Sequence, residues 1–161
     1  MFTKAIPLGL ASLVALTLVA PTTWKATLVA TGSSRLAGTA TVEAVGADST
    51  RATVMVTGAK AGSELAWHIH TGACGTKGEI VGPPAAYPSI KVGADGNAAG
   101  AAVLPISAPT TGEFTVTVHT STTDRKPVAC GALTPDTSMP KPMEMDSMKT
   151  MHQADTAKTR P

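Results

Sequence analysis

Short runs of alternating apolar and polar side chains constrain the fold of this 161-residue chain more than any other feature. A period of two places successive side chains on opposite faces of a β-strand. Clusters of glycine, proline, aspartate and serine separate the runs, and no segment has a helical period. We therefore predict an all-β fold, a β-sandwich or flattened barrel of seven or eight strands. The expected strands cover residues 24–30, 37–45, 50–57, 65–70, 89–92, 98–104, 114–119 and 128–133.

The beginning of the chain is typical of a targeting segment. Lys4 precedes an apolar run, residues 5–20, which is too short for a comfortable membrane span and is followed by no stop-transfer charges. We interpret residues 1–20 as a signal peptide and residues 21–134 as the exported domain. The expected location is periplasmic or secreted, with no membrane contact after signal cleavage.

The two cysteines agree with export, and the overall charge bears on the class of partner. An oxidising compartment allows Cys74 and Cys130 to form a disulfide, and the alternative is a pair of unpaired buried thiols. The chain carries 13 basic and 11 acidic residues with no polybasic patch. We therefore expect no nucleic-acid partner.

Two histidines share one face of the expected strand 65–70. Leu65, Trp67 and Ile69 alternate with them, so His68 and His70 project side by side from the opposite face. Paired imidazoles on one face of a strand are a good start for a metal site.

A third histidine lies in the same setting downstream. In strand 114–119 the apolar residues alternate inward, while Thr115, Thr117 and His119 share the outer face. We predict that His68, His70 and His119 bind a metal ion. The alternative is that all three are ordinary surface histidines.

The segment between the two histidine strands is unusual in length and composition. Residues 72–88 include four glycines, three prolines and Cys74, and they are too many for a simple hairpin. A disulfide near the last strand would hold this loop as one wall of a site. Tyr87, the single tyrosine, is expected to pack the loop.

The end of the chain differs in composition from the rest. Residues 135–161 have no hydrophobic period, and their main apolar residue is methionine, so we expect a disordered, Met-rich tail. Thioether sulfur is a soft ligand that suits Cu(I). The alternative is a solvated end without a metal role. The candidate secondary copper ligands are Met143, Met145, Met148, Met151 and His152.

These motifs together resemble the copper/zinc superoxide dismutase family. The run Trp-His-Ile-His at 67–70, followed by Gly72 and Cys74, is similar to the family's copper-ligand strand and loop cysteine. The run ending in His119 resembles the strand with a further copper ligand, and Ala-Cys-Gly at 129–131 matches the end of the last strand. The resemblance implies a Greek-key antiparallel sandwich, one copper ion on three histidines, a Cys74–Cys130 disulfide and superoxide as a substrate.

The chain departs from the family at two functional positions. Residues 75–91 contain no histidine, aspartate or cysteine, so a zinc site of the family's kind and its bridging imidazole are excluded. The family's anion-guiding arginine stands three residues before the second cysteine, where this chain has Pro127. Arg125 and Lys126 are displaced from that position, and Arg125 is the candidate anion guide. Whether superoxide is turned over is left open.

A second family, the chordin-type CHRD domain, offers an alternative. Its His-Ile-His-x-Gly and Val-His-Thr strands are similar to residues 68–72 and 118–120. That resemblance implies a non-enzymatic interaction domain, whereas the cysteine pair favours the dismutase-like reading. We therefore expect an exported protein for copper handling, served by a delivery partner that the sequence does not identify.

Overall fold

The computed structural model describes residues 23–136, and in this range the chain forms eight β-strands and one short 3-10 helix. The prediction of an all-β fold is confirmed. Most strand ends lie within two residues of the expected ones. The elements are β1 (Trp24–Ala30), β2 (Ala37–Gly46), β3 (Ser49–Thr57), β4 (Glu64–Thr71), η1 (Pro84–Ala86), β5 (Ile90–Lys91), β6 (Ala98–Leu104), β7 (Phe114–His119) and β8 (Pro127–Pro135).

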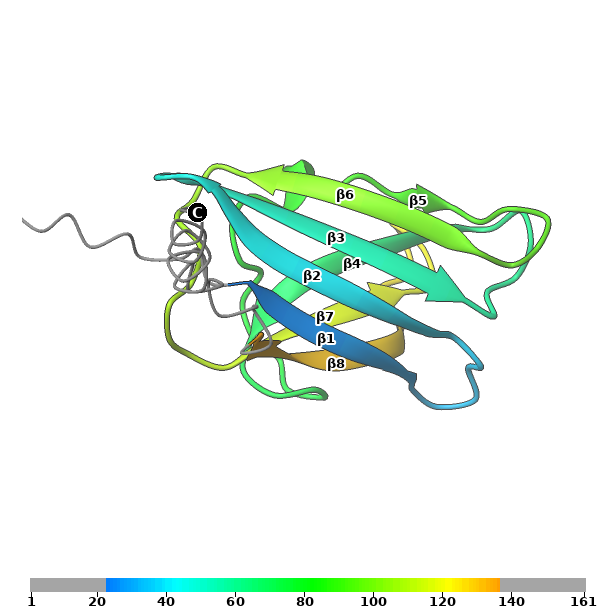
Figure 1. Cartoon of the computed structure of the whole chain (residues 1–161). Coiled ribbons are helices and arrows are strands. Elements are labelled where there is room, and N and C mark those ends of the chain that lie inside the picture. The colour runs from blue at the N-terminus through cyan, green and yellow to red at the C-terminus, as the bar shows by residue number, and fades with distance from the viewer. Residues whose placement is uncertain (1–22, 137–161) are drawn as a thin grey trace, which may run out of the picture.

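The strands form one curved antiparallel sheet in the order β5-β4-β7-β8-β1-β2-β3-β6. The outermost strands, β5 and β6, lie against each other, so the sheet curves into a nearly closed, flattened barrel (Figure 1). A side chain at Gly100 on β6 would overlap Ile90 on β5, which explains the glycine there. Strand β3 comes just before β4 in the chain, but it pairs with β2 and β6 and not with β4. Such pairing out of sequence order is typical of a Greek key.

The core of the barrel follows the alternation of the strands. On β3, Ala52, Val54 and Val56 are buried, whereas Met55 between them is 62% exposed. Trp67, Leu28 and Leu104 are among the largest fully buried side chains of the interior. Most other core residues are alanine and valine, which are small.

One region departs from simple alternation, because both faces of β4 and β7 are buried. Thr115 and Thr117, which we expected on an outer polar face, are 2% and 9% exposed. They do point away from the core, and the Thr117 hydroxyl lies 3.5 Å from the sulfur of Cys130, which a disulfide joins to Cys74 in the loop. Both faces of the sheet are therefore buried around β4, β7 and residues 129–131 of β8. His68 and His119 are buried in this region, and His70 is half-buried.

Within residues 23–136, no helix has the length and apolar character needed to cross a bilayer. The segment interpreted as a signal peptide lies outside the described residues.

Candidate metal centre

The pairing of β4 with β7 brings the three predicted histidines together. His68 lies opposite Thr117, and His119 lies opposite Ala66, so the two histidines are diagonal neighbours on the same face. His70 lies two residues further along β4 and points to that face as well. All three side chains therefore project outward into the space beneath the loop.

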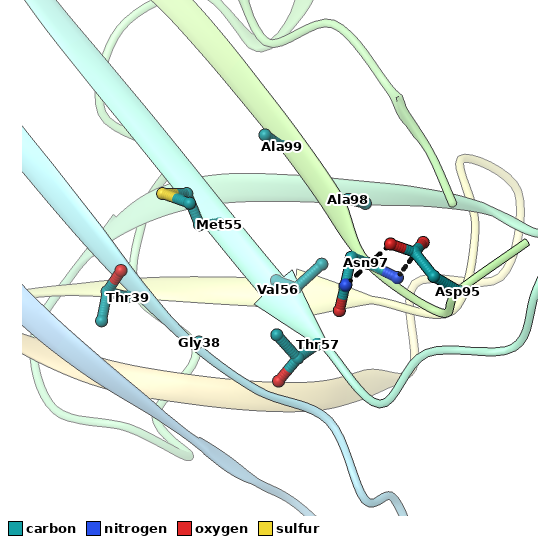
Figure 2. A pocket seen from close by; sticks show the side chains of 9 residues that line it. All are labelled: Gly38, Thr39, Met55, Val56, Thr57, Asp95, Asn97, Ala98 and Ala99. Carbon is teal, nitrogen blue, oxygen red and sulfur yellow. Dashed lines mark hydrogen bonds between the residues drawn. The ribbon is translucent and has the colours of Figure 1, made fainter. Parts of the chain in front are cut away.

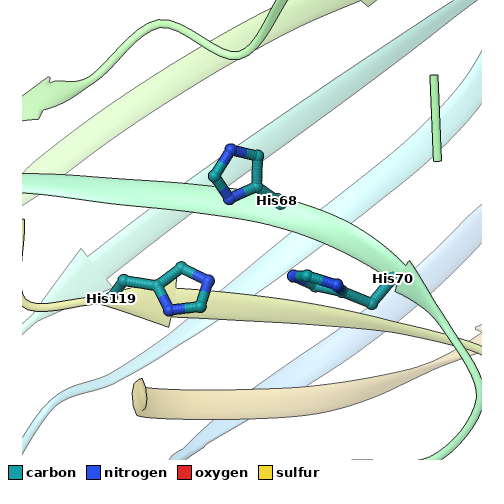
Figure 3. A group of neighbouring side chains, drawn as sticks. All are labelled: His68, His70 and His119. Atoms are coloured by element: carbon teal, nitrogen blue, oxygen red, sulfur yellow. The ribbon is translucent and has the colours of Figure 1, made fainter. Parts of the chain in front are cut away.

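The rings surround a single gap (Figure 3). Ring centroids are 5.6 Å apart for His68 and His119, and 5.9 Å apart for each of the other two pairs. One ligand nitrogen from each of the three lies within 4.8 Å of the others. At this spacing the three histidines could hold one metal ion after small side-chain rotations.

Backbone carbonyls fix the tautomers of two of these histidines. The Nδ1 atom of His70 is 3.1 Å from the carbonyl oxygen of Gly78, and Nδ1 of His119 is 2.9 Å from that of Arg125. A carbonyl oxygen only accepts, so each Nδ1 carries the proton and donates it. Each Nε2 is then left with a free lone pair, the form in which imidazole binds a metal.

These two lone pairs have no partner in the structure. Nε2 of His70 and Nε2 of His119 are buried and make no hydrogen bond with any described residue. A buried polar atom without a partner is costly and uncommon. The donor set therefore fits a metal ion, since bonding to a metal satisfies both atoms at once.

The surroundings of His68 and His119 favour the neutral form of these two imidazoles. The pKa of His68 is lowered to about 4, first by burial and then by the positive charges of His119, His70 and Arg125. Burial also lowers the pKa of His119, although its hydrogen bond to the Arg125 carbonyl opposes the shift. Because protons compete poorly for these two rings, the rings remain available to a metal at neutral pH.

The loop after β4 forms the wall that the sequence predicts. The Val81 amide donates to the Ile69 carbonyl at 2.9 Å, so the loop runs beside the edge of β4. Cys74 is bonded to Cys130 on β8, which confirms the disulfide. The Cys130 sulfur lies 3.5 Å from the Thr117 hydroxyl, directly beside the histidines. The loop is thus attached to the sheet on both sides of the centre.

Gly78 belongs to the candidate centre, although its sequence context does not predict this. A side chain there would overlap the carbonyl oxygen of Thr71, so the loop approaches β4 closely only with glycine at this position. This approach places the Gly78 carbonyl against His70. The sequence shows four glycines in the loop, and none carries a signal that sets it apart.

Arg125 lies in the β7–β8 loop, at the end of the centre near His119. Its side chain is exposed. Its positive charge is nevertheless close enough to lower the pKa values of His68 and His119. The proposed secondary ligands Met143, Met145, Met148, Met151 and His152 lie outside the described residues.

A separate open groove crosses β2, β3 and β6 on the outer surface of the barrel (Figure 2). None of its lining residues is a histidine or a cysteine, and the Asp95–Asn97 pair at its end is hydrogen-bonded internally. The groove therefore has no part in the metal centre. Its lining residues are Gly38, Thr39, Met55, Val56, Thr57, Asp95, Asn97, Ala98 and Ala99.

A scan against protein-family models finds no match for this chain, and a search of the curated proteins finds none either.

Proposed function

We propose that this is an exported copper-handling protein that binds one copper ion through His68, His70 and His119. The observation that carries the proposal is the pair of buried Nε2 atoms, on His70 and His119, that have no partner although their Nδ1 protons are engaged. A bound metal ion would satisfy both Nε2 atoms, and a ligand nitrogen of His68 lies within 4.8 Å of those of the other two histidines.

The chemistry of the donors favours copper over other divalent metals. Imidazole suits copper and zinc, but copper has the higher affinity for nitrogen sites of a given shape. No carboxylate or thiolate joins the three histidines among residues 23–136, so the ligand set is neutral. Neutral nitrogen ligands accommodate Cu(I) as well as Cu(II), and three ligands are one fewer than a structural zinc site uses, although a catalytic zinc site also has three.

We also propose that the methionines of the tail bind Cu(I) through their thioether sulfurs. Residues 137–161, if extended, reach on the order of 80 Å at about 3.3 Å per residue, which exceeds the length of the barrel strands. The tail is therefore long enough to bring its thioethers to the histidines. We propose that it collects Cu(I) and that the three-histidine centre retains the ion.

Superoxide dismutation is the second candidate, and the charge of Arg125 favours it. Bound copper would supply one-electron oxidation and reduction. The chain's own residues would keep two rings in fixed tautomers, exclude water through the loop, and attract an anion through Arg125. The missing bridging histidine argues for slow turnover.

Metal content tests the proposal in four forms of the protein. These are the wild type, the His68/His70/His119 triple alanine variant, a chain ending at Asp136, and the combination of the two changes. Each is loaded with Cu(I), Cu(II) or Zn²⁺ under competition with a chelator. We expect one tightly bound copper ion that the triple variant loses and the shortened chain keeps.

Three results would refute parts of this assignment. Equal copper content in the wild type and the triple variant would refute the histidine site. Tighter binding of Zn²⁺ than of copper would refute the choice of metal. Binding of no metal would favour the interaction-domain alternative.

For the second candidate, we expect the rate of superoxide dismutation to fall with increasing ionic strength and to be lower in Arg125→Gln. A rate no higher than that of the triple variant would exclude dismutation.

A further inference from the structure

The three histidines of the centre are not held in the same way. His70 and His119 are each fixed by a backbone carbonyl at Nδ1. His68 has no hydrogen bond from either ring nitrogen among the described residues. A metal ligand normally needs an outer partner that sets its orientation, and loss of such a partner commonly weakens metal binding 10- to 100-fold. Something other than a hydrogen bond must therefore orient His68.

Tyr87 is the side chain in position to do this. Its ring centroid lies 5.2 Å from that of His68, with an angle of 64° between the ring planes. It also lies 5.2 Å from the ring of Trp67 at 89°, an edge-to-face contact. Since Trp67 and His68 are consecutive and point to opposite faces of β4, a ring that touches both must lie beside the strand's edge.

Tyr87 is itself firmly held. Its hydroxyl donates to the Val81 carbonyl at 2.6 Å, within the same loop, and its side chain is 8% exposed. The residue that follows Tyr87 is held as well, because the Trp67 indole donates to the carbonyl of Pro88 at 3.0 Å. The loop and the core tryptophan therefore hold the Tyr87 ring from two sides.

We propose that Tyr87 is a positioning residue for the metal centre: its ring holds the His68 imidazole in the orientation from which it binds the metal. This inference rests on the proposed function and extends it. Ring packing here replaces the hydrogen bond that the other two ligands make. The orientation of His68 then depends on a well-ordered conformation of the loop that carries Tyr87.

Two substitutions at Tyr87 separate the ring from the hydroxyl. Tyr87→Phe keeps the ring and removes the bond to Val81, whereas Tyr87→Leu keeps apolar volume and removes the ring. We expect Tyr87→Phe to bind copper within about twofold of the wild type. We expect Tyr87→Leu to bind about tenfold more weakly, to release copper faster, and to show an altered Cu(II) EPR spectrum.

A matched control uses the other tryptophan of the fold. Trp24 makes an edge-to-face contact with Phe114 at 6.0 Å and donates from its indole to the Pro109 carbonyl. This pair also joins a tryptophan to a second aromatic ring edge to face, and among the described residues neither ring packs against a histidine ring. Phe114→Leu should therefore lower the melting temperature, as Tyr87→Leu does, yet leave copper affinity and the EPR spectrum unchanged.

A double-mutant cycle tests whether Tyr87 acts through His68. If it does, Tyr87→Leu should weaken binding in the wild type but add little to His68→Ala. Full additivity of the two losses, or an unchanged affinity and spectrum in Tyr87→Leu, would overturn the inference.

A wild type that takes up no copper would refute the proposed function instead. The positioning role is then decided in the metal-free protein by NMR of the histidine side chains. Tyr87→Leu should broaden or shift the His68 imidazole signals and leave those of His119 in place. Unchanged His68 signals would overturn the inference in that case.

Discussion

Breaking the Cys74–Cys130 bond should lower the free energy of unfolding by about 4 kcal/mol. The two cysteines are 56 residues apart, and in the chain-entropy relation a loop of that length restricts the unfolded chain by about 14 cal/mol/K, or about 4 kcal/mol at 25 °C. For a domain of this size such a loss lowers the melting temperature by about 15–20 °C. The loop also loses its attachment beside Thr117, so metal binding should weaken as well.

Urea unfolding of three samples measures this effect. They are the oxidised wild type, the reduced wild type, and a Cys74→Ser/Cys130→Ser variant. Reduction is the cleaner comparison because Cys130 is buried, and a serine hydroxyl there adds a cost of its own. The reductant should not change the double variant. A loss below about 1 kcal/mol on reduction would refute the entropic reasoning, and an unchanged copper affinity would remove the disulfide from the function of the centre.

Two further predictions concern the loop and the imidazoles. Gly78→Ala should weaken metal binding and lower the free energy of unfolding by about 1–3 kcal/mol, because the alanine side chain would overlap the Thr71 carbonyl and push the carbonyl of residue 78 away from His70. Urea unfolding measures the loss of stability, and chelator competition measures the loss of metal affinity. The exposed Lys77→Ala is the control, and equal behaviour of the two variants would contradict the close approach of the loop to β4. In the metal-free protein, NMR should give His68 a titration midpoint near pH 4. The unfolded chain takes up this proton near pH 6.5, so stability should fall on acidification between about pH 6.5 and 4; a native midpoint near 6.5 would contradict the burial of this ring.

The sequence predicts the strands of this protein well because alternation is a local property. Within β4 the period of two alone places His68 and His70 on one face. His119 is different, because its arrival beside them depends on the register of β4 with β7. That register could be inferred only through the resemblance of the motifs to a known family, not from the strands themselves.

The burial and orientation of the histidines could not be predicted from the sequence. They depend on the path of a loop that has no repeating pattern. The carbonyl partners of His70 and His119 are backbone atoms, which any residue type supplies. The contact of Tyr87 with His68 joins residues from a loop and a strand edge. Contacts of this kind are set by the folded path of the chain and leave no mark on composition or spacing.

The disulfide also imposes an order of events on the maturation of the centre. Cys130 belongs to β8, the last strand, whereas Cys74 follows directly on β4. The bond can therefore form only after the chain has been synthesised as far as Cys130, and it has its native surroundings once β8 pairs with β7. Until then the cover over the histidines is fastened on one side only. A chain that is still reduced lacks the covalent link between the loop and β8, so we expect it to release a metal ion bound at the proposed centre more readily than the oxidised chain does.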